Sequence, residues 1–332
     1  MLNETTSITE QLSHLLAGQS HAVSQIAEYV EVFQAGLSPE GRPAGVAMLL
    51  GPTGTGKTHT VESLAKVLHG STKHLLRIDC AEFQSDHEIA KLIGSPPGYL
   101  GHRETQPLLS QAKLNGSRSD ECELSLLLLD EIEKAAPSFA RLLFGILDKA
   151  TLRLGDNSVV NFENTFIFMT SNLGAEGMLA LSKPVWGFDA GIERPTTPEA
   201  LLKVGMRDLK HKFGNAFVGR LDIVAAYNPL TRADCDMILT EILAQAGSLI
   251  ARRRNTKAFR LAITQTARER LLDLGTSVEF GARELRRTVE KYFLHPAAKL
   301  AASGQIPPGG LVVLDEQLDD FSLSLRYQAT AA

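Results

Sequence analysis

The feature that most constrains this chain is a glycine-rich run between an apolar segment and a helical pattern. Residues 46–50 are apolar and predict a short buried strand, and residues 58–68 predict a helix. The run between them follows the pattern G-x-x-x-x-G-K-[ST] and consists of Gly51, Pro52, Thr53, Gly54, Thr55, Gly56, Lys57 and Thr58. A strand, a tight glycine turn and a helix in this order favour a parallel α/β sheet.

This run has the chemistry of a phosphate-binding loop. Glycines let backbone N–H groups surround phosphate oxygens, and the N-terminus of the following helix adds partial positive charge. Lys57 would neutralise the β- and γ-phosphates of ATP, and Thr58 would hold Mg²⁺. The alternative is a glycine-rich turn that binds nothing. The flanking strand and helix make that alternative the weaker one.

A second set of residues follows another apolar segment. Residues 124–129 predict a strand buried on both faces, and Asp130 and Glu131 come directly after it. The carboxyl ends of strands are where open α/β sheets bind ligands. We expect Asp130 to hold Mg²⁺ through its water shell and Glu131 to polarise the attacking water. Asn172, just past a predicted strand at residues 164–170, could orient that water.

The pattern of predicted elements divides the chain into two domains. Further strands at residues 75–79 and 221–226 alternate with helices, and a helix over residues 10–33 precedes the first strand. These elements predict a large α/β domain over residues 1–228. After a turn at residues 228–231, helices over residues 232–254, 266–274 and 282–302 and three short strands predict a smaller α+β domain over residues 229–332.

Composition limits the partners. Among 332 residues, 34 Lys and Arg against 38 Asp and Glu give a formal net charge of −4, so no general attraction to nucleic acid or anionic lipid is expected. The apolar runs are too short for a membrane span. Three cysteines without C-x-x-C spacing favour reduced thiols. Together with a polar start that lacks a signal-peptide pattern, they predict a cytoplasmic protein.

These motifs, in their order and spacing, resemble the AAA+ ATPases. Within that family they are most similar to the C-terminal ATPase module of two-ring Clp unfoldases. The resemblance covers nearly the whole chain, and the segments that carry it are residues 16–19, 51–58, 94–101, 128–134, 169–174, 219–222 and 281–283.

The resemblance implies an architecture and several further roles. The large domain should contain a five-stranded parallel sheet, and ATP should bind with Mg²⁺. Asn172 looks like the first sensor of the γ-phosphate, Arg220 like an arginine finger that reaches the ATP of a neighbouring subunit, and Arg283 like a second sensor on the small domain. A finger acting on a neighbour requires a homo-oligomer, and the resemblance implies a hexamer. From the residues alone, a surface salt bridge is the favoured interpretation of each arginine, although a guanidinium also gives fixed, bidentate phosphate contacts.

Tyr99 and Leu100 belong to a Pro/Gly-rich segment that resembles the substrate-gripping pore loop of Clp unfoldases. A single aromatic side chain between glycines can push on a passing chain whatever its sequence. The alternative is a turn whose tyrosine packs against the core. Residues 154–157 are a weaker candidate for a second loop of this kind.

The implied function is an ATP-dependent unfoldase that threads a protein substrate through a ring pore. Two alternatives stay open, a DNA-acting AAA+ motor and an assembly or scaffold protein that switches without threading. The second draws on a departure from the family pattern. The segment before Arg220 reads Phe217-Val218-Gly219 where Phe-Leu-Asn is common, and that variant resembles secretion-associated members. The sequence identifies no adaptor or peptidase partner.

Overall fold

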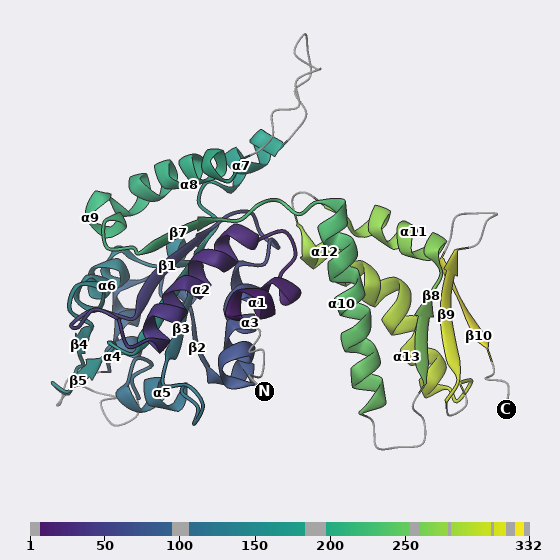
Figure 1. Cartoon of the computed structure of the whole chain (residues 1–332), viewed down its shortest axis with the longest axis horizontal. Coiled ribbons are helices and arrows are strands. Elements are labelled where there is room, and N and C mark those ends of the chain that lie inside the picture. The colour runs from purple at the N-terminus through teal and green to yellow at the C-terminus, as the bar shows by residue number, and fades with distance from the viewer. Residues whose placement is uncertain are drawn as a thin grey trace, which may run out of the picture. The chain divides into compact units, whose positions relative to one another are not determined.

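The structure is a computed structural model that describes residues 7–94, 106–182, 197–252, 259–277, 280–306, 309–316 and 323–328. The chain divides into two compact units, Met1–Pro229 and Leu230–Ala332, whose helices and strands are labelled in Figure 1. None of the helices within the described ranges combines the length and the apolarity that crossing a membrane requires.

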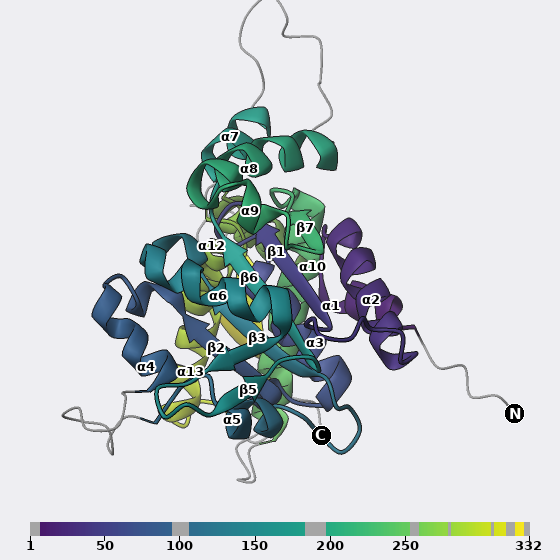
Figure 2. The ribbon, with the colours of Figure 1, turned by 90° about the vertical axis from the view of Figure 1, so that its left-hand side faces the viewer.

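The first unit is built on a five-stranded sheet, which confirms the predicted fold. Its strands lie in the order β2-β3-β6-β1-β7, and every neighbouring pair is parallel (Figure 2). The strands are β1 (Gly45–Leu50), β2 (Leu75–Asp79), β3 (Ser125–Asp130), β6 (Thr165–Ser171) and β7 (Ile223–Ala226). Because β1, β3 and β6 are parallel neighbours, the loop after β1, the acidic residues after β3 and Asn172 after β6 leave the sheet at one edge.

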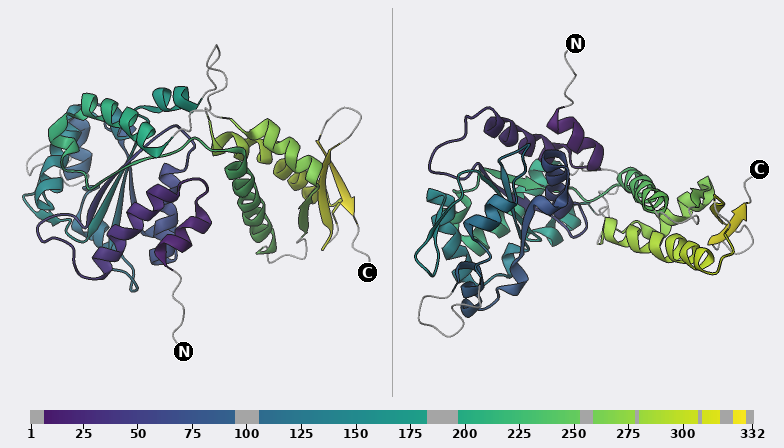
Figure 3. Two further views of the ribbon diagram at one scale, coloured as in Figure 1. Left: turned by 45° about the horizontal axis from the view of Figure 1, so that its top comes forward. Right: turned by 90° about the horizontal axis from the view of Figure 1, so that it is seen from below.

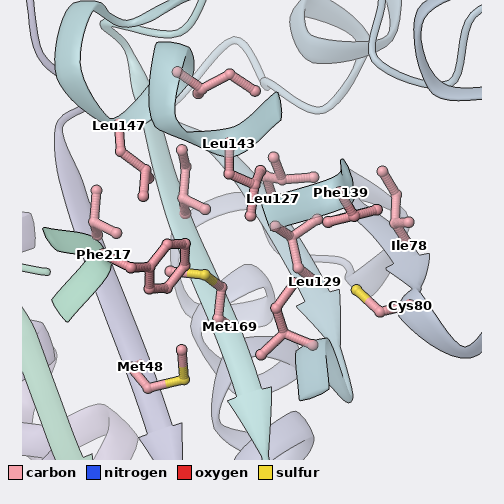
Figure 4. Close-up of a cluster of buried hydrophobic side chains, with 14 of the residues drawn as sticks. Met48, Ile78, Cys80, Leu127, Leu129, Phe139, Leu143, Leu147, Met169 and Phe217 are labelled. Carbon is pink, nitrogen blue, oxygen red and sulfur yellow. The ribbon is translucent and has the colours of Figure 1, made fainter. Parts of the chain in front are cut away.

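Side chains of the strands alternate between two buried layers. On β1, Met48 and Leu50 join a layer with α6, α8 and α9, while Ala47 and Leu49 join a layer with α1, α2 and α3. Figure 3 shows the sheet between these helices, and Figure 4 shows part of the first layer, where Met48, Leu127 and Met169 lie beside Leu143 and Phe217. The helices are α1 (Ile8–Leu15), α2 (Ser20–Gln34), α3 (Lys57–His69), α6 (Pro137–Lys149), α8 (Pro198–Phe213) and α9 (Asn215–Val218). Coverage on both faces explains why every residue of β1, β3 and β6 is buried and why the central residues of these strands are apolar.

The single helix predicted over residues 10–33 is wrong, because the chain forms two helices there. Helix α1 ends at Leu15 and α2 begins at Ser20. Leu16, which follows α1, is extended with φ of −130°, and Gly18 has φ of 74°, a left-handed conformation that glycine adopts at little cost. The break leaves the backbone at residues 16–19 free to pass beside the phosphate-binding loop.

Smaller elements complete the first unit. They are α4 (Ala90–Ile93), α5 (Gln111–Gly116), α7 (Ala175–Ser182) and an antiparallel hairpin of β4 (Thr151–Arg153) and β5 (Val159–Asn161). The sequence analysis missed this hairpin because its strands are three residues long. Its turn holds Asn157 at φ of 68°, a conformation that asparagine tolerates better than most residues.

In its described residues, the second unit packs four helices and a three-stranded sheet around a core of its own. Its elements are α10 (Arg232–Ala251), β8 (Arg260–Ile263), α11 (Gln265–Gly275), α12 (Ala282–Val289), α13 (His295–Ala302), β9 (Leu311–Glu316) and β10 (Leu323–Gln328). A π-helical turn, Glu290–Leu294, joins α12 to α13. Pro296 lies in the first turn of α13 and has no N–H to donate, which accounts for the irregular hydrogen bonding at this point.

Candidate functional site

The phosphate-binding loop, residues 51–58, connects β1 to α3 and presents the start of α3 without a cap. Gly56, the residue before the helix, has φ of 102° and no side chain that could cap it. The first N–H groups of an α-helix point out of its N-terminus, so the start of α3 favours an anion. Gly51, the first residue of the loop, is required for a steric reason. A Cβ at this position would lie 2.9 Å from Cβ of Tyr227, so no other residue fits between β1 and the start of the loop.

Lys57 joins the loop to the end of β6. Its ammonium group donates to the carbonyl oxygens of Gly51 at 2.6 Å and Pro52 at 2.8 Å, and to Oδ1 of Asn172 at 3.0 Å. The residue is only 7% exposed, so its charge is held within the loop. The structure thus brings Lys57 and Asn172 together, although they lie 115 positions apart in the sequence.

Asp130 at the end of β3 accepts hydrogen bonds at both of its carboxylate oxygens. Oδ1 accepts from Thr58 Oγ1 at 3.2 Å and from Thr170 Oγ1 at 2.5 Å, and Oδ2 accepts from Nη2 of Arg77 at 2.5 Å. The sequence analysis named Thr58 and missed Thr170 and Arg77. The missed signal was a charged residue inside the strand at residues 75–79, where a purely structural strand would carry an apolar side chain.

The pairing of Thr58 with Asp130 suits a hard cation. Hydroxyl and carboxylate oxygens are the ligands that Mg²⁺ prefers, and Mg²⁺ in proteins commonly keeps several water molecules. A hydroxyl that binds a metal through its oxygen keeps its proton, so it can still donate to a carboxylate. The hydrogen bond from Thr58 to Asp130 therefore fits a site in which the hydroxyl binds the cation and the carboxylate holds its waters. Within the described residues, no three His, Cys, Asp or Glu side chains form a metal-binding group.

Glu131 is the next residue along the chain and has an unusual backbone conformation. Its φ of 56° is left-handed, and its N–H donates to Thr170 Oγ1 at 3.0 Å. Its carboxylate forms an ion pair with Lys134, and hydrogen bonding to Glu131 raises the pKa of Lys134 above its usual value. Lys134 therefore holds the candidate base toward the short helical turn that follows β3.

Asn172 is positioned by a third acidic residue. Its backbone N–H donates to Oε1 of Glu133 at 3.1 Å, while its side chain accepts from Lys57. The other carboxylate oxygen of Glu133 is buried and has no hydrogen-bond partner in the described part of the chain. Glu133 thus links the turn after β3 to the end of β6, a role that sequence reasoning did not assign.

Gln19 fastens the break between α1 and α2 to the phosphate-binding loop and to the end of the first unit. Its side-chain amide donates to the carbonyl oxygens of Thr55 at 3.3 Å and Asn228 at 3.0 Å, and its carbonyl oxygen accepts from the Asn228 N–H at 3.0 Å. The residue is 3% exposed, and its bonds satisfy both ends of a buried amide. The sequence analysis placed Gln19 in a family motif and assigned it no contacts.

Arg220 lies after α9 and has its own set of partners. Nε and Nη2 donate to the two carboxylate oxygens of Asp148 at 2.6 and 2.9 Å, Nη1 donates to the Ala216 carbonyl oxygen, and the guanidinium lies 4.9 Å from the centre of the Phe144 ring. The hydrogen bond from Arg220 lowers the pKa of Asp148. These contacts fix Arg220 without joining it to the residues of the phosphate-binding loop.

The remaining candidates are separate from this cluster. Arg283 is exposed near the start of α12, in the second unit. Tyr99 and Leu100 lie outside the described residues. The residues before and after their segment are tied to each other, since Leu108 and Leu109 donate to the carbonyl oxygens of Lys91 and Leu92 at 3.0 Å each.

Comparison with known families finds two matches that follow one another along the chain. Residues 42–224 match the family described as AAA domain (Cdc48 subfamily). Residues 230–314 match the family described as the C-terminal, D2-small domain of ClpB protein. The two matched ranges fall on either side of the division between the compact units.

Individual relatives agree with these families. The chain is 34% identical over 314 residues to the chaperone protein ClpB of Aquifex aeolicus, which covers 95% of this chain and 30% of that protein. It is 31% identical over 335 residues to the ATP-dependent Clp protease ATP-binding subunit ClpC of Staphylococcus epidermidis, covering 99% of this chain and 39% of that protein. The chain therefore spans about a third of the length of these relatives.

A solved structure has the same fold. It is a cryo-EM reconstruction of Hsp104 in a closed state, with ATPγS and FITC casein. The TM-score is 0.79 at 25% sequence identity, over 96% of this chain and 51% of that one.

Proposed function

Because this chain belongs to the AAA domain family and carries a small domain of the ClpB type, we propose that it is the ATP-hydrolysing module of a protein unfoldase. The observation that carries the proposal is the convergence of Lys57, Asp130, Glu131 and Asn172 at one edge of the sheet, beside the start of α3. The likeness to proteins named as chaperones, and to an Hsp104 structure that contains casein, supports a polypeptide as the substrate.

In this proposal the chain binds ATP, and Lys57 moves its ammonium group from the loop carbonyls to the phosphate oxygens. Thr58 and Asp130 would hold Mg²⁺ and its waters, and the bound metal would neutralise charge on the phosphates. Glu131 turns away from Lys134 and accepts a proton from the water that attacks the γ-phosphate. Asn172, fixed by Glu133, orients that water from the end of β6.

The proposal extends to an oligomer. Arg220 would complete the site of a neighbouring subunit, because within its own chain it is bound to Asp148 and not to the phosphate-binding loop. Arg283 would contact the nucleotide from the small domain. A hexameric ring and a cytoplasmic location belong to the proposal as well, since both rest on the family resemblance and the sequence pattern.

Tyr99 carries the mechanical part of the proposal. The ends of its segment are anchored by backbone hydrogen bonds at residues 91–92, and Ile93 also accepts a bond from the Gly155 N–H at 2.8 Å. This bond connects the residue before the candidate pore segment to the hairpin of β4 and β5, so the movements of the segment and the hairpin would be coupled. Hydrolysis would shift both and move the bound polypeptide along the ring.

The test separates hydrolysis from mechanical work. Glu131→Gln should bind ATP and fail to hydrolyse it, because an amide cannot accept the proton. Tyr99→Ala should hydrolyse ATP and fail to unfold a tagged fluorescent protein, whereas Tyr99→Phe should keep much of both activities because the ring makes the contact. Phosphate release and loss of substrate fluorescence are measured in the same sample. Normal unfolding by Tyr99→Ala would contradict threading and favour the assembly or scaffold alternative.

A further inference from the structure

Arg77 is a charged residue inside a strand of the sheet, and its side chain lies at the candidate metal site. It belongs to β2, whose residue Asp79 is in register with Asp130 of β3. Residues two apart on a strand face the same side, so Arg77 and Asp130 lie on one face of the sheet. The Nη2 atom of Arg77 is 2.5 Å from Oδ2 of Asp130, and its Nη1 is 3.7 Å from Oε1 of Glu62 on α3.

The hydrogen bonds of Asp130 show what Arg77 occupies. Oδ1 already accepts from two hydroxyl groups, those of Thr58 and Thr170, and a carboxylate oxygen has about two acceptor positions. A further donor, such as a metal-bound water, must therefore be accepted at Oδ2. Arg77 takes one of the two acceptor positions on that oxygen, so it lies directly beside any water that Asp130 would hold.

The charges of Arg77 and Asp130 also indicate that Arg77 competes with a metal for this carboxylate. Asp130 is 8% exposed, and a buried carboxylate without a counter-ion is strongly unfavourable. Arg77 supplies the counter-ion while no nucleotide is bound. Once a hydrated divalent cation lies beside Thr58, two cations share one carboxylate at short range and repel each other. The guanidinium has room to withdraw, because its side chain is half exposed.

We propose that Arg77 is the resident counter-ion of Asp130 and competes with the metal for this carboxylate, and that it thereby sets how strongly nucleotide binding depends on Mg²⁺. The inference rests on the proposed function, since it assumes that Thr58 and Asp130 hold the metal of a bound ATP. Arg77 acts in two directions. Its charge attracts the phosphates of ATP when no metal is present, and its bond to Asp130 opposes the metal when one is.

The test compares ATP affinity with and without metal. A fluorescent ATP analogue is titrated into the full chain in excess Mg²⁺ and again in excess EDTA. The dissociation constant in EDTA divided by the dissociation constant in Mg²⁺ measures the metal dependence. In Arg77→Met the metal-free affinity should fall and the affinity with Mg²⁺ should hold or rise. The ratio should therefore increase about tenfold, which corresponds to about 1.4 kcal/mol.

Two variants serve as controls. Glu62→Gln contacts Arg77 from α3 and does not bond to Asp130, so its ratio should stay close to that of the unaltered protein. Arg77→Lys keeps the charge and loses the planar guanidinium, so its ratio should lie between that of the unaltered protein and that of Arg77→Met. It also provides the comparison if Arg77→Met is too unstable to purify, in which case any increase over the unaltered ratio supports the proposal.

Two results would overturn the inference. An unchanged ratio would make Arg77 a structural partner of β3 alone. A decreased ratio would mean that Arg77 orients Asp130 for the metal and does not compete with it. Failure of the proposed function has a different signature, because the unaltered chain would then bind no nucleotide in either condition and would behave as Lys57→Ala does.

Discussion

At the scale of single residues, the hydroxyl of Thr170 contacts two consecutive acidic residues of the candidate site. It donates to Asp130 and accepts from the N–H of Glu131, so one side chain fixes two consecutive acidic residues. The second of these has a left-handed backbone that costs about 1–2 kcal/mol for a residue other than glycine. That conformation persists because its surroundings satisfy it, and Thr170 provides one of the bonds that do so.

Replacing Thr170 tests this arrangement. Thr170→Val keeps the shape and removes both bonds, leaving a buried N–H without a partner. We expect the free energy of unfolding to fall by about 1–3 kcal/mol and ATP turnover to fall about tenfold or more. Urea unfolding and phosphate release measure the two effects. Thr170→Ser keeps the hydroxyl and should stay close to the unaltered protein in turnover. Full turnover by the valine variant would show that Glu131 does not depend on Thr170.

At the scale of elements, the contact between α7 and α8 determines where the segment of Arg220 begins. Gly174 precedes α7 with φ of 78°, and a Cβ there would lie 2.8 Å from Cα of Gly205 in the middle of α8. Two glycines thus let the backbones of the helices touch. Because α8 leads directly into α9 and Arg220, this close contact helps to fix the position of the guanidinium.

A pair of glycine variants isolates the contact. Gly174→Ala and Gly70→Ala both place alanine in a left-handed conformation, but at Gly70 nothing lies within 4 Å of the added Cβ. In each variant the free energy of unfolding should fall by about 1 kcal/mol or more, because alanine is strained in this backbone conformation. Gly174→Ala should lose a further 1–3 kcal/mol, roughly, because a backbone atom must shift. Urea unfolding of both variants gives the difference. Equal losses would mean that α7 and α8 separate easily.

At the scale of the whole molecule, the position of Arg220 favours action between subunits. Its bonds to Asp148 and Ala216 hold the guanidinium in place, and its side chain is still 30% exposed. A guanidinium held at both ends of its fork is well placed to meet a phosphate, because little side-chain entropy remains to be lost. The structure thus contains an ordered arginine whose guanidinium donates to Asp148 and Ala216.

Mixing two inactive variants tests this directly. Arg220→Ala should bind ATP and lose turnover by about 10³–10⁵-fold, as arginine fingers do elsewhere. Lys57→Ala should fail to bind ATP. In an equal mixture, random assembly pairs an intact loop with a neighbour's intact Arg220 at about one site in four, so activity should return to about that fraction. No recovery at any mixing ratio would place Arg220 in its own subunit's site.

The sequence alone determined the parts of this protein that consist of neighbouring residues. The glycine run at residues 51–58 and the apolar strand before Asp130 are local patterns, because phosphate binding and strand burial each require particular residue types at consecutive positions. Their presence was enough to predict the parallel sheet and to name Lys57, Thr58, Asp130 and Glu131. The break at Gly18 was not predicted, because a glycine inside a helical pattern ends a helix only where tertiary contacts favour it.

Only the tertiary structure decided which distant side chains meet. Arg77 and Asp130 are 53 positions apart, Thr170 and Asp130 are 40 apart, and Arg220 and Asp148 are 72 apart. The first two pairs depend on β2, β3 and β6 lying side by side in one parallel register, and the third depends on α6 and α9 packing on the same face of the sheet. A shift of one residue in strand register would turn the side chains of the first two pairs to the other face of the sheet. The contacts of all three pairs therefore follow from tertiary packing and cannot be predicted from any single segment.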